Sequence, residues 1–417
     1  MMLNIKKYVL FAAVLLLQLQ ALGQESLTLD TILNRIDQNN AYLKAFNSRA
    51  KSISVQAQGA KAWMPPMIGA GTYMTPYPRQ GQVVEQDKGA LMFSLEQEIP
   101  NPAKLNRKQE YQRSLSSVEI EGRENAFNDL RFTARKLYYQ WLVAEKRMEV
   151  VQENDRILLT LKKLARIRYS YNKGNLSSIY AAEAKLFDVE NMQMLLESEI
   201  RKKQIGLNTL MNRPAQEVFK IDTSTEVKFN PLAGIDTSYL SQSRSEIRKI
   251  DKNIASMKLN TEAAKAEARP DLRIRFDHMA NRDAMMPAQF TAMAMISIPI
   301  APWSAKGYRS EVKAMQLNIE AMKNERRARL IETENIIQSM LSDLMVMEHH
   351  LDNYQQKIIP ALRKSFDASH IAYEENQSDL PTVIRAWEEL NMARMKYLDE
   401  MENYYLMIAE YEKEIEK

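Results

Sequence analysis

The chain has 417 residues, a formal net charge of +4 and no cysteine. The lack of cysteine excludes disulfides, thiolate metal sites and an acylated N-terminal cysteine, and so small a charge excludes the basic surface that nucleic-acid binding needs. The sequence also has no Gly-rich phosphate loop and no nucleophile elbow, so we expect neither enzymatic activity nor a cofactor.

The first 23 residues have the pattern of a secretory signal peptide. Lys6 and Lys7 form a basic start, residues 8–17 are apolar, and Ala21 and Gly23 are small residues at the −3 and −1 positions of a cleavage site. The apolar stretch is too short to span a bilayer as a helix of the mature protein. We therefore expect residues 1–23 to be removed on export.

Residues 24–214 are expected to form a helix, two strands and two further helices. Residues 27–62 carry apolar side chains at helical spacing until a Pro-Pro pair interrupts them. Strands are expected near residues 67–75 and 89–98, with a polar loop between them. The second of these alternates apolar and polar residues, which predicts a strand with one apolar face.

A helix of about seventy residues is predicted over residues 101–171. Its apolar residues fall at alternating steps of four and three, at Leu130, Ala134, Leu137, Trp141, Ala144, Met148 and Val151. This 3.5-residue repeat keeps one seam against a partner helix, and a single helix of this length would extend ~100 Å. A turn at Gly174, which can supply a positive φ, separates it from a helix over residues 176–211.

Residues 215–241 are rich in Thr, Asp, Pro and Gly, which predicts a linker with little structure of its own. The same order of elements returns over residues 242–417, with strands near residues 271–279 and 289–298 and a long helix over residues 302–373. Five matching pairs lie 202 residues apart: Lys104 and Lys306, Arg107 and Arg309, Leu142 and Leu344, Lys162 and Lys364, and Tyr171 and Tyr373. The chain is an internal duplication.

The strands have the length that a transmembrane β-barrel uses, about nine to eleven residues with one apolar face. Four strands cannot close a barrel alone. Either several copies of the chain share one barrel, or the strands form a small soluble sheet.

Together these features resemble the TolC-like outer-membrane efflux channels over essentially the whole mature chain. Besides the duplicated plan, two motifs carry the resemblance: Leu95-x-Gln97-x-Ile99-Pro100 with Lys104 and Arg107 in the following helix, and Arg168-Tyr169-x-Tyr171-x-x-Gly174-Asn175-Leu176-Ser177. The resemblance implies a mainly α fold with a small β part. Three copies would share a twelve-stranded β-barrel in the outer membrane of a Gram-negative bacterium, and their coiled-coil helices would form an α-barrel in the periplasm.

The resemblance also implies a passive channel of a tripartite efflux pump, in contact with outer-membrane lipid. Its partners would be a periplasmic adaptor protein and an inner-membrane pump of the RND type. The two turns would contact the adaptor through Tyr171, Lys173, Gly174, Asn175, Leu176, Ser177, Tyr373, Asn376, Gln377, Ser378, Asp379 and Leu380. The charged strand faces would line a water-filled lumen through Glu96, Glu98, Arg273, Arg275 and Asp277.

Several alternatives stay open at this stage. Lys104 and Lys306 are either positive groups near a channel wall or snorkelling surface residues. Tyr171 and Tyr373 either contact the adaptor or pack the helix ends. In the second turn Asn376 stands in the place of Gly174 and tolerates a positive φ as well.

The cargo and the class of protein also stay open. Methionines around the second hairpin, with His278, Met279, Met285 and Met286 as candidate ligands, suit Cu(I) or Ag(I) and favour the heavy-metal branch of the family. Methionine is more often a flexible apolar filler, however, and the alternative cargo is a drug-like organic molecule or a polypeptide of type I secretion. A soluble periplasmic coiled-coil adaptor is the alternative from another class.

Overall fold

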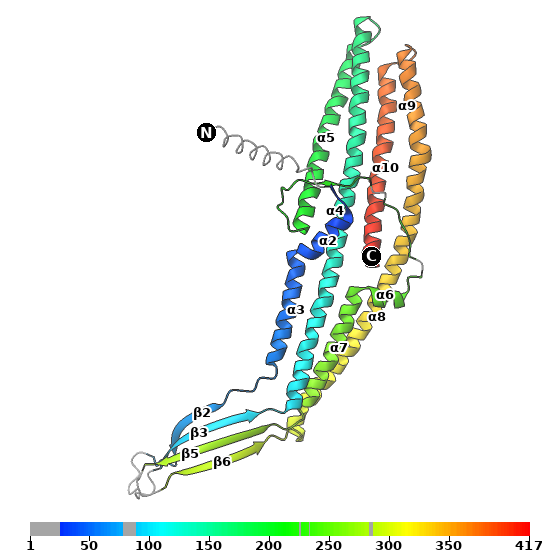
Figure 1. The fold of residues 1–417 in the computed structure, drawn as a ribbon. Coiled ribbons are helices and arrows are strands. Elements are labelled where there is room, and N and C mark those ends of the chain that lie inside the picture. Colours follow the sequence, from blue (N-terminus) through cyan, green and yellow to red (C-terminus); the bar gives the residue numbers. More distant parts are fainter. Residues whose placement is uncertain (1–25, 78–88, 225–226, 233, 283–286) are drawn as a thin grey trace, which may run out of the picture. The chain divides into compact units, whose positions relative to one another are not determined.

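The computed structural model describes residues 26–77, 89–224, 227–232, 234–282 and 287–417 (Figure 1). The described residues divide into two compact units, and each unit combines segments of both repeats. The sheet unit comprises residues 45–124 and 245–330, and the helix unit comprises residues 26–44, 125–244 and 331–417. No helix among the described residues is both long enough and apolar enough to cross a membrane.

The sheet unit contains a four-stranded antiparallel sheet in the order β2-β3-β5-β6. Its strands are β2 (Met67–Tyr73), β3 (Ala90–Ile99), β5 (Leu272–Asn281) and β6 (Gln289–Ile296). The two central strands come from different repeats, so the sheet joins the two copies of the duplication.

The helix expected over residues 27–62 is two helices, α2 (Leu29–Asn39) and α3 (Ala41–Gly59). Asn40 between them has extended backbone, and its Oδ1 accepts hydrogen bonds from the N–H groups of Tyr42 at 3.0 Å and Leu43 at 3.3 Å. An asparagine in this position satisfies the first free N–H groups of the second helix. The cap at Asn40 therefore divides into two helices a segment whose apolar spacing predicts one continuous helix.

The long helix predicted from the 3.5-residue repeat is α4 (Pro102–Ser170), which has 69 residues. The predicted seam is buried at Ala134, Trp141, Ala144, Met148 and Val151. In the helix unit, α4 packs with α5 (Leu176–Leu210), α9 (Ile359–Glu374) and α10 (Leu380–Glu414) around one apolar core (Figure 1). The prediction of this helix and its seam is confirmed.

The segment predicted as one helix over residues 302–373 is helical over its whole length but is not uniformly α-helical. The segment consists of α8 (Pro302–Asn353), the π-helical segment η2 (Tyr354–Ile358) and α9. Pro360 lies two residues after the end of η2, and proline has no N–H to donate to the carbonyl of Gln356 four residues earlier, so the helix widens there.

The widened turn holds one extra residue. Ile337 and Leu344 are buried seven residues apart, and so are Phe366 and Tyr373. Phe366 follows Leu344 by 22 positions, one more than the 21 positions of three heptads. The buried seam of the second copy is therefore continuous only because η2 takes up the additional residue.

The segment 215–241 is more structured than predicted. It contains β4 (Lys220–Ile221), which pairs in parallel with β1 (Ser26–Leu27), and the start of α6 (Thr237–Ser243). The ring of Phe219 is buried edge-on against Trp141, with ring centroids 5.2 Å apart. Burial of this aromatic side chain fixes the segment against α4, although its composition is typical of an unstructured linker. The helix α7 (Ser245–Ala266) follows in the sheet unit.

Candidate functional site

The four-stranded sheet has one charged face and one apolar face. Strand register places Glu96 opposite Arg275 and Glu98 opposite Arg273, and Asp277 lies two residues beyond Arg275 on β5. Directly paired residues point to the same side of a sheet, as do residues two apart on a strand, so these five residues share one face. The other face carries Ile68, Leu91, Phe93, Leu95, Ile274, Phe276, Phe290 and Ile296.

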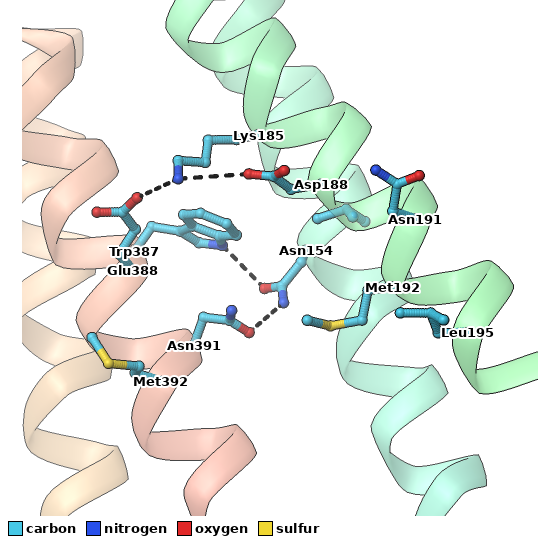
Figure 2. Close-up of a pocket in the computed structure, with 11 residues that line it drawn as sticks. Asn154, Lys185, Asp188, Asn191, Met192, Leu195, Trp387, Glu388, Asn391 and Met392 are labelled. Carbon is cyan, nitrogen blue, oxygen red and sulfur yellow. Dashed lines mark hydrogen bonds and ion pairs between the residues drawn. The ribbon is translucent and has the colours of Figure 1, made fainter. Parts of the chain in front are cut away.

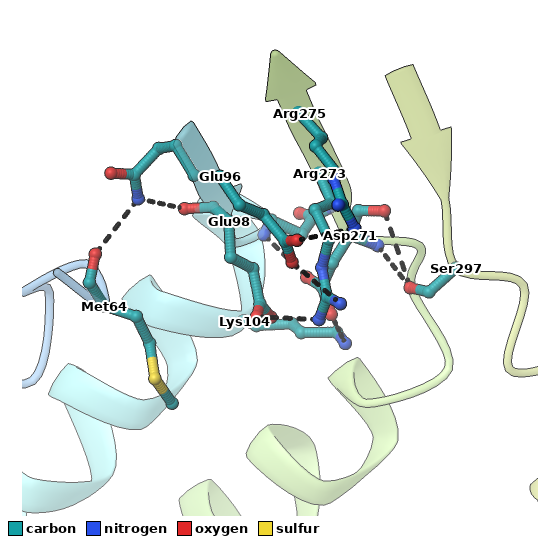
Figure 3. Close-up of polar contacts among 10 residues, drawn as sticks. Met64, Glu96, Glu98, Lys104, Asp271, Arg273, Arg275 and Ser297 are labelled. Carbon is teal, nitrogen blue, oxygen red and sulfur yellow. Dashed lines mark hydrogen bonds and ion pairs between the residues drawn. The ribbon is translucent and has the colours of Figure 1, made fainter. Parts of the chain in front are cut away.

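The five charged residues form one connected series of ion pairs, and Figure 3 shows Arg273 of β5 beside Glu96 and Glu98 of β3. Arg273 Nη1 lies 3.1 Å from Glu96 Oε1, and its Nη2 lies 3.3 Å from Glu98 Oε2. Arg275 Nη1 lies 4.0 Å from Glu96 Oε2, and its Nε lies 3.0 Å from Asp277 Oδ1. Three carboxylates and two guanidinium groups leave the series with a formal net charge of −1.

Exposure on this sheet is the reverse of that on a half-covered soluble sheet. On the apolar face Ile68 is 82% exposed and Phe290 is 69% exposed, whereas the side chain of Asp277 on the charged face is only 9% exposed. A soluble sheet buries its apolar face and presents its charges to water. The apolar face of this chain therefore requires an apolar environment that a single copy does not provide.

The sheet has two further features, a pair of exposed tryptophans near the strand ends and two open strand edges. Trp63, before β2, and Trp303, in the first turn of α8, are both exposed. Within the described residues, the outer strands β2 and β6 pair on one side only. Unpaired strand edges are templates for pairing with another chain.

The sequence-based metal candidates do not converge. His278 and Met279 are neighbours on β5, so His278 lies on the apolar face and Met279 lies on the charged face opposite Met92. Met285 and Met286 lie outside the described residues. In the part of the chain that the structure describes, no group of three or more His, Asp or Glu side chains could hold a metal ion.

Lys104 and Lys306 have different surroundings. The Nζ atom of Lys104 lies 2.6 Å from Asp271 Oδ2 and 3.4 Å from Glu267 Oε2, and its side chain is mostly buried (Figure 3). Partial burial alone would raise the pKa of Asp271, but hydrogen bonds from Lys104 and from the N–H of Asn101 outweigh it and lower that pKa. Lys104 therefore ties the start of α4 to the start of β5, whereas Lys306 is exposed.

The turn between α4 and α5 is a Schellman motif. Asn172 has a φ of 57°, its N–H donates to the carbonyl of Tyr169, and the N–H of Lys173 donates to the carbonyl of Arg168 at 2.9 Å. The assignment of the positive φ to Gly174 is wrong. Gly174 fits for a different reason, because a Cβ there would lie 3.2 Å from the Cβ of Arg168, a tight contact that disfavours larger residues.

The turn between α9 and α10 has the same motif. Asn376 has a φ of 64°, as expected, and the N–H of Gln377 donates to the carbonyl of Ala372 at 2.8 Å. Asp379 then caps α10 by accepting a hydrogen bond from the N–H of Thr382. Asparagine supplies the left-handed residue in both turns.

The two turns are offset from the 202-residue repeat. Asn376 follows Asn172 by 204 residues. Tyr373 is therefore the structural counterpart of Tyr169 and not of Tyr171. Accordingly Tyr171 is 73% exposed, whereas Tyr373 is 3% exposed and packs at the helix end.

The exposed residues of the two turns form a smaller set than the twelve named from the sequence. Tyr373 and Leu380 are buried, so they cannot offer a surface to a partner. Ser378 is half-buried. The exposed members are Tyr171, Lys173, Gly174, Asn175, Leu176, Ser177, Asn376, Gln377 and Asp379.

Arg168 connects the two turns, a role that sequence reasoning missed. It is buried, and its Nη2 donates to the carbonyl of Tyr373 and, at 2.8 Å, to Oδ1 of Asn376. Its guanidinium carbon lies 3.9 Å from the centre of the Tyr373 ring, a cation–π geometry. The contact spans 205 residues of sequence, so no local pattern could have indicated it.

A cavity of about 530 Å³ lies between α4, α5 and α10 (Figure 2). On one wall the Nε1 of Trp387 donates to Oδ1 of Asn154 at 3.0 Å, and Nδ2 of Asn154 donates to Oδ1 of Asn391 at 2.6 Å. On another wall Lys185 lies 2.9 Å from Glu388. The remaining apolar lining consists of Val189, Met192, Leu195 and Met392. The buried amide of Asn154 and the half-buried amide of Asn391 hold α4 and α10 in register, because a polar pair in a coiled-coil core disfavours sliding.

Solved structures of outer-membrane channels share this architecture. The channel OprN is 16% identical with a TM-score of 0.73, covering 93% of this chain and 89% of its own. CmeC of Campylobacter jejuni is 14% identical (TM-score 0.71, 93% and 85% covered), and the open state of MtrE of Neisseria gonorrhoeae is 14% identical (TM-score 0.72, 93% and 88% covered).

No protein-family model matches the sequence, and neither does any curated protein. At these identities the similarity concerns the fold. The chain has the mainly α, TolC-like fold of these outer-membrane channels, as the sequence predicted.

Proposed function

We propose that the protein is the outer-membrane channel of a tripartite efflux pump in a Gram-negative bacterium and passively conducts substrates from the periplasm to the exterior. The observation that carries this proposal is the exposed apolar face of the sheet, where Ile68 is 82% exposed and Phe290 is 69% exposed. In a chain with the fold of outer-membrane channels, lipid is the apolar environment that such a face requires.

The dimensions of the sheet fit this role. The central strands β3 and β5 each have 10 residues, and at ~3.3 Å per residue a tilted strand of this length crosses the hydrocarbon layer. Exposed Trp63 and Trp303, at the ends of the strands that adjoin the helices, suit the boundary between lipid and water, where tryptophan is enriched.

The open edges of β2 and β6 support a homotrimer. Three copies pairing edge to edge would close the four-stranded sheets into a twelve-stranded barrel. Because the apolar faces would point outward to lipid, Glu96, Glu98, Arg273, Arg275 and Asp277 would line the water-filled lumen. Conduction through a lumen requires no catalytic residue, so no enzymatic activity is proposed.

The turns are the proposed docking surface for a periplasmic adaptor, which would connect the channel to an inner-membrane pump of the RND type. Tyr171 and Gln377 are exposed on different turns. The buried side chain of Arg168 joins the two turns by its hydrogen bond to Asn376. An adaptor hairpin could therefore contact both turns as one surface.

The cargo proposed is soft metal ions such as Cu(I) or Ag(I), with drug-like organics or a secreted polypeptide as the alternative. Five methionines lie on the charged face of the sheet, at Met67, Met92, Met279, Met293 and Met295. Thioethers are suitable ligands for these ions. Greater sensitivity of a deletion strain to copper and silver than to dyes would support this cargo, and the reverse sensitivity would assign organics.

Membrane fractionation tests the channel proposal. The full chain should be found in the outer membrane, should be released only by detergent, and should elute from size exclusion as a trimer. Release without detergent as a monomer would instead indicate the soluble periplasmic adaptor.

Crosslinking tests the docking surface, and the absence of native cysteine makes single-cysteine variants unambiguous. Asn175→Cys and Gln377→Cys should trap an adaptor in cells, whereas Glu190→Cys, exposed on α5 away from the turns, should not. Equal trapping at all three positions, or none at the turns, would remove the docking assignment.

A further inference from the structure

We infer that the charges of Arg273 and Glu98, one of each sign, set the ion selectivity of the lumen by keeping the series of charges on the sheet close to neutral. The inference rests on the proposed function, since it requires the charged face to line a conducting pore. It assigns a specificity-determining role to Arg273 and Glu98. It also explains why the glutamates of β3 are paired with arginines of β5.

Arg273 is the most exposed of the five charged side chains, and Glu98 is the more exposed of its two carboxylate partners. Arg273 and Glu98 have side chains that are 46% and 35% exposed, whereas Asp277, at the opposite end of the series, is nearly covered. Water and permeating ions would therefore meet Arg273 and Glu98 directly. The charge on Asp277 would be screened from them by its contact with Arg275.

The composition of the series also determines whether a substitution makes its net charge more negative or less negative. With both arginines present the series has a net charge of −1 per copy. Without Arg273, Arg275 alone faces the three carboxylates and the net charge becomes −2; without the charge of Glu98, the net charge becomes zero. Lumen charges act on ions within about 10 Å at 0.1 M salt, which is comparable to the radius of a narrow pore.

Reversal potentials of the purified full-length channel in planar lipid bilayers, under a tenfold KCl gradient, test the inference. Arg273→Gln should raise the ratio of K⁺ to Cl⁻ permeability roughly twofold, because the fixed charge per copy doubles. Glu98→Gln should lower the ratio by a similar factor. The double variant removes one charge of each sign and should return to the wild-type ratio.

Two controls separate charge from structure. Arg273→Lys keeps the charge but loses the two-pronged contact with Glu96 and Glu98, so it should keep the wild-type ratio. Arg269→Gln makes the same change of charge at an exposed position between α7 and β5, and it should leave the ratio unchanged.

An unchanged ratio in Arg273→Gln, with normal conductance and normal size on size exclusion, would overturn the inference while leaving the channel intact. A shift as large in Arg269→Gln would overturn it as well, because the effect would then belong to total charge. Absence of any conductance from the wild-type protein would instead refute the proposed function on which the inference depends.

Discussion

The two copies of the repeat share one plan, but they contribute different chemistry at both ends of the long helix. Near the sheet, Lys104 of the first copy is buried against Asp271 of the second, whereas Lys306 is exposed. At the turns, Arg168 of the first copy donates to Asn376 of the second. In both places the first copy supplies the cation and the second copy supplies the acceptor. Duplication therefore set the plan, and later divergence joined the copies to each other.

The largest effect is expected from Arg168→Ala. This change removes the guanidinium donor to the carbonyl of Tyr373 and to Oδ1 of Asn376, and it removes the contact with the Tyr373 ring. The free energy of unfolding should fall by about 2–4 kcal/mol. Urea unfolding of the detergent-solubilised protein, followed by circular dichroism at 222 nm, measures it. Arg166→Ala, exposed on the same turn of α4, should cost less than about 0.5 kcal/mol; equal losses would show that the turns are not joined through Arg168.

A smaller effect is expected where the helices meet the sheet. Lys104→Met keeps the length of the side chain but leaves the carboxylate of Asp271 partly buried without its cation, which should cost about 1–2 kcal/mol. Lys306→Met should change stability by less than about 0.5 kcal/mol, because that side chain is exposed. Thermal unfolding of the two variants side by side checks the asymmetry, and matching shifts in Tm would contradict it.

The two asparagines with positive φ at the helix turns, Asn172 and Asn376, give a finer comparison. Glycine tolerates their backbone conformation, so Asn172→Gly should change the free energy of unfolding by less than about 0.5 kcal/mol. Asn376→Gly also removes an acceptor of Arg168 and should cost about 1 kcal/mol more than Asn172→Gly. In the Arg168→Ala background this difference should disappear, and its persistence would mean that the amide of Asn376 acts elsewhere.

The smallest effect concerns pH. Because the folded-state pKa of Asp271 is lowered, its carboxylate contributes stability that is fully present above its unfolded pKa of about 4 and is lost as pH falls through the folded value. Stability should therefore decline below about pH 4, and less steeply in Lys104→Met than in the wild type. Urea midpoints measured between pH 6 and pH 3 test this, and identical slopes in the two proteins would exclude Asp271 as a contributor.

Periodic features of the fold were predictable because each depends on neighbours close in sequence. The four-three spacing through Trp141 and Met148 predicts a seam, and that seam is buried. Alternation on β3 predicts two faces of different polarity, and the register confirms that Glu96 and Arg275 share one of them. The resemblance of the whole pattern to TolC-like channels gave the correct fold.

Contacts across the duplication were not predictable in the same way. Arg168 reads as an ordinary basic residue in the last turn of a helix, and only the packing of α4 against α9 and α10 shows that it is buried. The positive φ was assigned to Gly174 because glycine is the commonest residue there, yet asparagine also adopts it. Tyr373 is buried against Arg168 of the other copy, a contact that the 202-residue repeat does not indicate.

The π-helical segment η2 has a consequence for how the long helical arm of the second copy, formed by α8, η2 and α9, can evolve. One residue added to an α-helix rotates everything beyond it by about 100°, which would turn Phe366 and Tyr373 away from the helices they pack against. Because η2 absorbs the added residue within one wide turn, rotational phase is preserved on both sides of it. The arm can thus change in length by single residues, and not only by whole heptads, without losing the orientation of its far end.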